Sequence, residues 1–290
     1  MPPYALGTPF AIEKSSKVSG CHTHVSQEVK IMGKVLELVG GPPASGKSTY
    51  IRVKYGSQSN REFVHLDYDA MVVKEVERSC GRVAEQDVRD HVSMVYGFER
   101  STVIYGDPAR VTVDWPFCVS KRAEEYISIG RNADRFVECN FFTAQATEAW
   151  KRSLTRHVAG EYNAFTVFLN KDSNIAEALR PSFRIFLEAH RDMPASVERI
   201  FPQADAAYLW DNNERDAMPV LIALCKKGEK IRVVDQVRWD RFQYKREIDI
   251  DAEFEVLDSR VEEFQGKPRT LFKVRYANVI RSGKEKEFLV

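Results

Sequence analysis

Residues 41 to 48 constrain the fold more than any other part of the sequence. They read Gly-Pro-Pro-Ala-Ser-Gly-Lys-Ser and match the phosphate-loop pattern Gly-x4-Gly-Lys-Ser/Thr. The apolar run Val35–Val39 comes just before this loop and predicts a short buried strand, and Thr49 begins a segment compatible with a helix. A strand, this loop and a helix in succession form the setting in which the motif binds nucleotide phosphates. The sequence therefore predicts a nucleotide site on an α/β domain.

The residue types of the loop assign the expected contacts. Backbone amides from Gly46 to Thr49, together with the helix N-terminus, form a site for the β-phosphate. Lys47 is expected to reach the β- and γ-phosphates, and the Ser48 hydroxyl to bind the Mg²⁺ that bridges them. The loop residues expected to bind nucleotide are Gly41, Pro43, Ala44, Ser45, Gly46, Lys47, Ser48 and Thr49.

The composition of the chain disfavours several classes of protein. Forty-three basic and 42 acidic residues give a net charge of +1, so no global field attracts nucleic acid or an anionic membrane. The five scattered cysteines lack a Cys-x-x-Cys pair, which favours a reducing compartment over a disulfide framework. No apolar run approaches the length of a membrane span, and the N-terminus lacks the features of a Sec signal. These features predict a cytoplasmic protein, with delivery into a host cell by a non-Sec route as the alternative.

The sequence divides into three segments. Residues 1–33 are rich in Pro, Ser, Gly and Lys and predict a poorly ordered leader. Residues 34–225 alternate short apolar runs with helical patterns, which predicts a doubly wound parallel sheet flanked by helices. Residues 226–290 change to alternating charged and β-prone residues, which predicts a small β-rich C-terminal appendage.

The middle segment carries the predicted elements of the α/β domain. A crossover spans Val72 to Asn132 and contains predicted helices at Ala84–Tyr96 and Val119–Ile129. A connection of that length often carries substrate-binding surface. The predicted strands are Lys34–Val39, Phe63–Leu66, Arg135–Cys139, Ala164–Leu169 and Ala207–Trp210.

Two carboxylates, Asp67 and Asp69, follow the second predicted strand about twenty residues after Lys47. The carboxyl ends of parallel strands form the ligand-binding edge of such a sheet. Either carboxylate could accept a proton from an attacking hydroxyl group. The alternative is that these residues cap the helix that begins near Ala70.

Arg184 and Arg191 lie seven residues apart in a helical pattern and share one face of the predicted helix. Cationic side chains on a mobile helix can neutralise the charge that develops on a transferred phosphoryl group. The alternative is a solvated ion-pair ladder through Glu188, which lies between them at helical spacing.

Glu138 lies near the end of the third predicted strand, where its carboxylate is expected to face the ligand crevice and bind substrate hydroxyls. A lone Glu here, in place of an apolar run followed by Asp-Glu, argues against a motor or hydrolase. The alternative is a partly buried Glu that hydrogen bonds to backbone amides.

Taken together, these motifs resemble the zeta-toxin family of P-loop kinases, with part of the plan shared by polynucleotide kinases. The resemblance covers roughly residues 34–215. It implies ATP as the phosphoryl donor and Mg²⁺ as the metal. It also implies that Asp69 is the catalytic base, whereas the spacing of polynucleotide kinases would select Asp67.

The same resemblance assigns further residues. It implies that Glu138 holds the substrate, that Arg184 and Arg191 are the two lid arginines, and that Asn212 lies near the adenine. Cys139-Asn140-Phe141 replaces the Gly-Thr-Gly that follows the Glu in zeta toxins, so the acceptor pocket differs from theirs. No Arg follows Asp69 where polynucleotide kinases carry one, which weakens that alternative.

The resulting hypothesis is a toxin or effector kinase that phosphorylates a sugar hydroxyl of a small nucleotide. UDP-N-acetylglucosamine and NAD are both open as acceptors, because a type III effector branch of the superfamily phosphorylates NAD. An antitoxin or chaperone is the expected protein partner, and nucleic acid and membrane are disfavoured. The alternatives are a polynucleotide 5′-hydroxyl kinase and a non-catalytic, nucleotide-dependent binding module.

Overall fold

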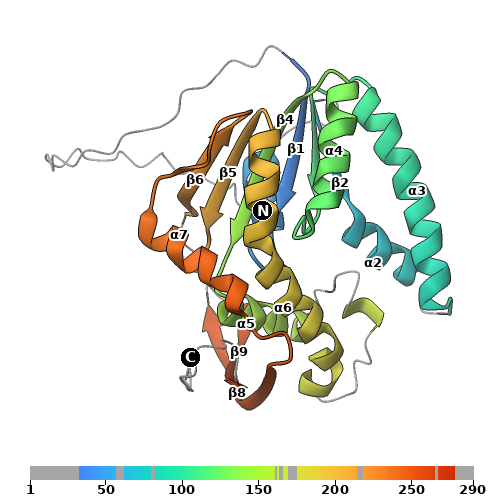
Figure 1. Cartoon of the computed structure of the whole chain (residues 1–290). Coiled ribbons are helices and arrows are strands. Elements are labelled where there is room, and N and C mark those ends of the chain that lie inside the picture. Colours follow the sequence, from blue (N-terminus) through green and yellow to red (C-terminus); the bar gives the residue numbers. More distant parts are fainter. Residues whose placement is uncertain are drawn as a thin grey trace, which may run out of the picture. The chain divides into compact units, whose positions relative to one another are not determined.

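The computed structural model describes residues 33–56, 62–79, 82–160, 162, 166–168, 175–213, 218–264 and 267–277. Its central element is a seven-stranded sheet with the order β2-β3-β1-β4-β5-β6-β7 (Figure 1). The first five strands in this order pair in parallel, and β6 and β7 are antiparallel to their neighbours. The strands are β1 (Val35–Gly40), β2 (Phe63–Asp67), β3 (Arg110–Asp114), β4 (Phe136–Thr143), β5 (Ala206–Asp211), β6 (Val220–Lys226) and β7 (Arg232–Val233).

Helices lie on both faces of this sheet, with α4 and α6 across one of them (Figure 1). The α-helices are α1 (Lys47–Tyr55), α2 (Tyr68–Arg78), α3 (Glu85–Tyr105), α4 (Ser120–Asn132), α5 (Ala146–Val158), α6 (Ile175–Ile200) and α7 (Gln236–Gln243). Three short 3₁₀ turns, η1 to η3, occupy Thr166–Phe168, Phe201–Gln203 and Tyr244–Glu247. A separate hairpin consists of β8 (Glu253–Phe264) and β9 (Lys267–Ala277).

Alternate side chains of β1 face the helices on opposite sides of the sheet. Leu36 and Leu38 are fully buried in the core that α4 and α6 share with the sheet. Val39 faces the other way and packs against Ile51 and Tyr55 of α1. Successive side chains of a strand point to opposite faces, so an apolar run buried on both sides is what a central parallel strand requires.

The predicted fold class is confirmed, but two predicted details are wrong. The crossover from Val72 to Asn132 contains a strand, β3, which inserts between β2 and β1. Thr166–Phe168, within the strand predicted at Ala164–Leu169, is a 3₁₀ turn, and the other residues of that range lie outside the described part. Val167 packs beside α2 and α3, so its apolar side chain serves a small cluster away from the sheet.

The C-terminal part adds to the same body. Beyond Lys226, β7 extends the main sheet, and Phe242 of α7 is buried in the main core. Phe254 of β8 packs edge-on against Trp150 of α5 and Phe183 of α6. The described residues from Gly33 onward form one compact unit, whereas the predicted leader lies almost wholly outside the described residues.

Candidate nucleotide site

The phosphate loop joins β1 to α1 and depends on two glycines. Gly41 and Gly46 have φ values of 137° and 102°, a region that side chains disfavour. A Cβ at Gly46 would lie 2.0 Å from Asn212 Nδ2, and one at Gly41 would lie 2.2 Å from Phe142 O. The loop closes tightly against the ends of β4 and β5, so both positions require glycine.

Lys47 is the first residue of α1 and lies against the loop. Its Nζ donates hydrogen bonds to Gly41 O at 3.0 Å and Pro42 O at 3.3 Å. The same Nζ lies 4.0 Å from Asp114 Oδ1 at the end of β3. The lysine is therefore placed between the loop and an acidic group, as a mobile charge for phosphate binding requires.

Asp114 completes the site and was not identified from the sequence. The Ser48 hydroxyl donates a hydrogen bond to Asp114 Oδ2 at 3.1 Å. Asp114 lies next to β1 because β3 pairs with β1, with Asp114 opposite Val39. The β-branched run Val111-Thr112-Val113 before an aspartate was the available signal for this strand.

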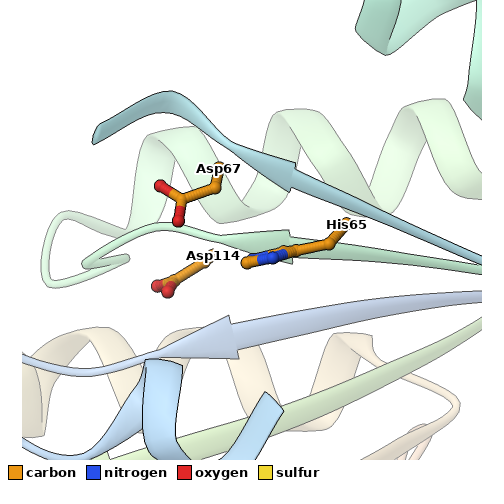
Figure 2. Close-up of side chains that lie close together, drawn as sticks. All are labelled: His65, Asp67 and Asp114. Atoms are coloured by element: carbon orange, nitrogen blue, oxygen red, sulfur yellow. The ribbon is translucent and has the colours of Figure 1, made fainter. Parts of the chain in front are cut away.

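His65, Asp67 and Asp114 form a cluster (Figure 2), and Asp114 is the member that accepts the hydrogen bond from Ser48. One potential ligand atom from each residue lies within 4.8 Å of the others. Burial raises the pKa of Asp114, the nearby Asp67 raises it further, and Lys47 partly opposes the shift. Two crowded carboxylates and a serine hydroxyl are the oxygen donors that Mg²⁺ prefers, so these residues fit the expected metal.

The two candidate bases occupy different places. Asp67 is the last residue of β2, and its Oδ1 accepts a hydrogen bond from Ala70 N at 3.0 Å. The helix-cap alternative therefore holds for Asp67. Asp69 lies in the first turn of α2 and is exposed. Asp67 thus belongs to the cluster with His65 and Asp114, and Asp69 is exposed in the first turn of α2.

Glu138 does not lie at the ligand-binding edge, so its predicted position near the strand end is wrong. It is the third residue of β4, opposite Glu37 of β1, and the strand continues to Thr143. Glu138 accepts hydrogen bonds from Asn140 Nδ2 at 2.6 Å and Arg110 Nη1 at 3.4 Å. Its partners are side chains and not the backbone amides expected in the alternative interpretation.

Glu37 is the centre of the polar cluster that contains Glu138. Burial alone would raise the pKa of Glu37, but Lys54, the Tyr55 hydrogen bond and Arg110 outweigh it, and the pKa is lowered. Tyr55 Oη donates to Glu37 at 2.7 Å, and Lys54 Nζ lies 3.2 Å away. This fully buried glutamate therefore joins α1 to the sheet, away from the phosphate loop.

The two predicted lid arginines, Arg184 and Arg191, both lie close to carboxylates. Arg184 Nε lies 3.2 Å from Glu188 Oε1, which is the ion pair of the alternative interpretation, and its Nη1 lies 3.6 Å from Asp251 Oδ1. Arg191 is half-buried and donates to Asp192 Oδ1 at 2.8 Å. Arg191 also lines a cavity of about 410 Å³, together with Cys118, Val119, Ser120, Asp192, Ala195, Ser196, Arg199 and Arg246.

Asn212 contacts the loop directly. Its Nδ2 donates a hydrogen bond to Ser45 O at 2.9 Å, and its backbone N–H donates to Thr143 O at 2.8 Å. Arg152 Nη1 donates to Asn212 O at 2.8 Å and fixes the segment from the other side. The structure therefore places Asn212 where it can hold the loop in shape.

Comparison with solved structures finds the same fold elsewhere. A chain of the AvrRxo1-ORF1:AvrRxo1-ORF2 complex with sulphate ions superimposes with a TM-score of 0.53 and 13% identity. The corresponding complex with ATP gives 0.53 and 14%. This chain shares their fold. The match covers 73% of this chain and 64% of the other, so this chain spans less than two thirds of that neighbour.

One further solved structure is less similar to this chain. A chain of the PezAT chromosomal toxin-antitoxin system of Streptococcus pneumoniae gives a TM-score of 0.46 and 14% identity, over 65% of this chain and 70% of that one. No protein-family model matches the sequence, and a search of curated proteins finds no match. Within the described ranges, no helix has both the length and the apolar character needed to cross a membrane.

Proposed function

We propose that this chain is an ATP- and Mg²⁺-dependent kinase that phosphorylates a sugar hydroxyl of a small nucleotide. The observation that carries the proposal is the Ser48–Asp114 hydrogen bond at 3.1 Å, with Lys47 Nζ 4.0 Å from the same carboxylate. A phosphate loop, a hydroxyl ligand and an acid on the neighbouring strand form the donor half of a phosphotransferase. This chain shares its fold with a chain of a complex that was crystallised with ATP, which supports ATP as the phosphoryl donor.

The roles follow from the positions of the side chains. Lys47 binds the β- and γ-phosphates, and Ser48, Asp114 and Asp67 would hold the metal. When bound, Mg²⁺ offsets phosphate charge and orients the transferred group. Asp69 is the proposed base, because an exposed carboxylate at this edge can meet an incoming hydroxyl group.

The cavity beside Arg191 supports a small phosphate-bearing acceptor. Arg191, Arg199 and Arg246 line it, and its volume of about 410 Å³ suits part of a nucleotide. Arg199 pairs with Glu124 and Arg246 with Glu198, so the cavity lacks the strong positive field of a polynucleotide groove. This pattern favours UDP-N-acetylglucosamine or NAD over a nucleic acid end.

A role as a toxin or effector is part of the proposal. The structural neighbour was crystallised as a complex of AvrRxo1-ORF1 with AvrRxo1-ORF2. We expect this chain to act in the cytoplasm of its target cell, with an antitoxin or chaperone as its protein partner. Co-expression with the product of a neighbouring reading frame, followed by co-purification, tests this expectation.

The decisive experiment uses the purified full chain with γ-labelled ATP, Mg²⁺ and one acceptor at a time. The acceptors are UDP-N-acetylglucosamine, NAD and a 5′-hydroxyl oligonucleotide, and mass spectrometry locates the new phosphate. Label on a sugar hydroxyl that disappears with Lys47→Ala supports the proposal. Label on the oligonucleotide supports the polynucleotide kinase, and tight ATP binding without any product supports the binding module.

A further inference from the structure

Lys245 is a buried lysine from the C-terminal part of the chain. It lies in the 3₁₀ turn Tyr244–Glu247 and is 8% exposed. Its Nζ donates a hydrogen bond to Ala144 O and lies 2.8 Å from His190 Nδ1. Lysines are seldom this buried, because the charged form loses its hydration. Two well-placed partners in the interior therefore point to a role for this amine.

The first partner, Ala144, supports the phosphate loop. Ala144 directly follows Thr143, the last residue of β4, whose carbonyl accepts the Asn212 N–H at 2.8 Å. The Asn212 side chain in turn donates to Ser45 O within the loop at 2.9 Å. A hydrogen bond from Lys245 to Ala144 O therefore fixes the strand end against which the loop is held.

The second partner, His190, belongs to α6 and is fully buried. Its neighbour in sequence is Arg191, which lines the cavity proposed for the acceptor. Arg246, the residue after Lys245, pairs with Glu198 of the same helix at 2.6 Å. The turn that carries Lys245 is thus bound to α6 at two points, and it connects α6 to the end of β4.

The two contacts of Lys245 are compatible with a neutral amine. A neutral amine has two N–H groups, one for Ala144 O and one for His190 Nδ1. Burial lowers the pKa of Lys245 to about 7, although Cys118 and Asp211 act in the opposite direction. Burial, then Lys245 and Lys47, lower the pKa of His190 well below its usual value, so its imidazole is neutral and can accept.

We propose that Lys245 is a positioning residue for phosphoryl transfer, whose amine holds α6 and Arg191 in register with the strand end that supports the phosphate loop. The inference rests on the proposed kinase function and extends it to the C-terminal segment. Protonation adds a buried charge, so the folded arrangement that joins α6 to β4 loses stability as the pH falls.

Lys245→Met tests this role, with Lys230→Met, at an exposed lysine, as the control. Turnover and the ATP dissociation constant are measured on the full chain from pH 6 to pH 9. We expect Lys245→Met to lose about tenfold in kcat at pH 8, the loss of about 1.4 kcal/mol expected for one or two hydrogen bonds. ATP affinity should stay within about twofold, because the hydrogen bond from Asn212 to Ser45 O still holds the loop. We expect the kcat of the wild type to decline below about pH 7, and we expect this decline to be absent in Lys245→Met.

Two results overturn the proposal. One is a Lys245→Met protein with the wild-type kcat and pH profile. The other is an equal loss of kcat and ATP affinity, which indicates general damage to the fold. A wild-type chain that phosphorylates no acceptor rejects the kinase function, and with it this inference, so the two failures are distinguishable.

A second pair of variants applies if Lys245→Met does not fold. His190→Asn keeps an acceptor oxygen near the position of Nδ1, and His190→Phe removes it. We expect His190→Asn to retain roughly tenfold more turnover than His190→Phe, at similar ATP affinity. Equal turnover in the two variants would show that the link through His190 has no effect on the reaction.

Discussion

The Ser48 hydroxyl hydrogen bonds to Asp114 at 3.1 Å and so joins the first turn of α1 to the end of β3. Ser48 belongs to a motif that is visible in the sequence, and Asp114 lies 66 residues away. Parallel pairing of β3 with β1 is what brings them together. The proposed chemistry therefore depends on a contact that only the fold creates.

Asp114→Asn should separate activity from stability. We expect phosphoryl transfer to fall on the order of a hundredfold or more, because an amide is a poor ligand for Mg²⁺. Burial raises the pKa of Asp114 in the folded chain. The ionised carboxylate therefore destabilises the fold as the pH rises above 3.8, the ordinary pKa of this group. The melting temperature at pH 7 should therefore be unchanged or higher, as measured by calorimetry. Asp107→Asn, at an exposed position, is the control.

We expect Asp69→Asn and Asp67→Asn to impair different steps, the first the chemical step and the second the binding of Mg²⁺. If Asp69 is the base, its variant loses about 10²- to 10⁴-fold in kcat while its ATP affinity and melting temperature stay constant. Asn can replace Asp67 as a helix cap, so that variant should keep α2 and need more Mg²⁺ for half-maximal activity. A full loss of kcat with Asp67→Asn, combined with an active Asp69→Asn, would reverse the assignment.

Glu37→Gln should destabilise the chain without a selective effect on the acceptor. The variant leaves Lys54 and Arg110 without their buried partner, which typically costs about 3–5 kcal/mol. The pKa of Glu37 is lowered, so its contribution to stability is present above 4.5 and is lost as the pH falls through its folded pKa. Urea unfolding at pH 7 and at acid pH measures both effects. Glu138→Gln should change stability less and leave the acceptor KM unaltered.

Asn212→Ala should loosen the phosphate loop. The variant removes the hydrogen bond to Ser45 O, and a loss of about 1.4 kcal/mol corresponds to tenfold weaker ATP binding. Gly46→Ala should be more severe, because its Cβ would collide with Asn212 Nδ2 and the φ of 102° disfavours a side chain. Calorimetric titration with ATP distinguishes the two. An Asn212→Ala protein with wild-type affinity would contradict the supporting role.

The stability of the chain should rise with pH above neutrality because of Lys245. Its folded pKa is about 7 and its ordinary value is 10.5, so between them the unfolded chain binds more protons. The free energy of unfolding then increases by up to about 1.4 kcal/mol per pH unit. The difference between wild type and Lys245→Met, measured by urea unfolding from pH 7 to pH 9.5, isolates this contribution. A pH-independent difference would mean that Lys245 titrates normally.

Local sequence signals accounted for part of this site. The phosphate loop is a contiguous motif, and its strand and helix follow from the residues on either side. β3 was missed because it has only five residues and lies between two helical patterns. Its pairing with β1 is a long-range contact that no local pattern encodes.

Glu138 shows a second limit of local patterns. The strand was predicted to end at Cys139, before Asn140, an amide residue that disfavours strands. In the fold, Asn140 donates to Glu37 and Glu138 and accepts a hydrogen bond from Trp210, so β4 continues past it. Tertiary partners override propensity here, and the continuation moves the end of the strand away from Glu138.

The short strand β7 covers part of one edge of β6. β6 reads Val-Leu-Ile-Ala-Leu-Cys-Lys and has no charged residue before Lys226. β7 pairs with Ala223 and Leu224, and Val234 N donates to Ile222 O at 2.8 Å. A chain cut after Lys226 would expose this apolar strand as an open edge, which is a template for pairing between molecules. Shortened forms that end there should aggregate, whatever becomes of the phosphate loop.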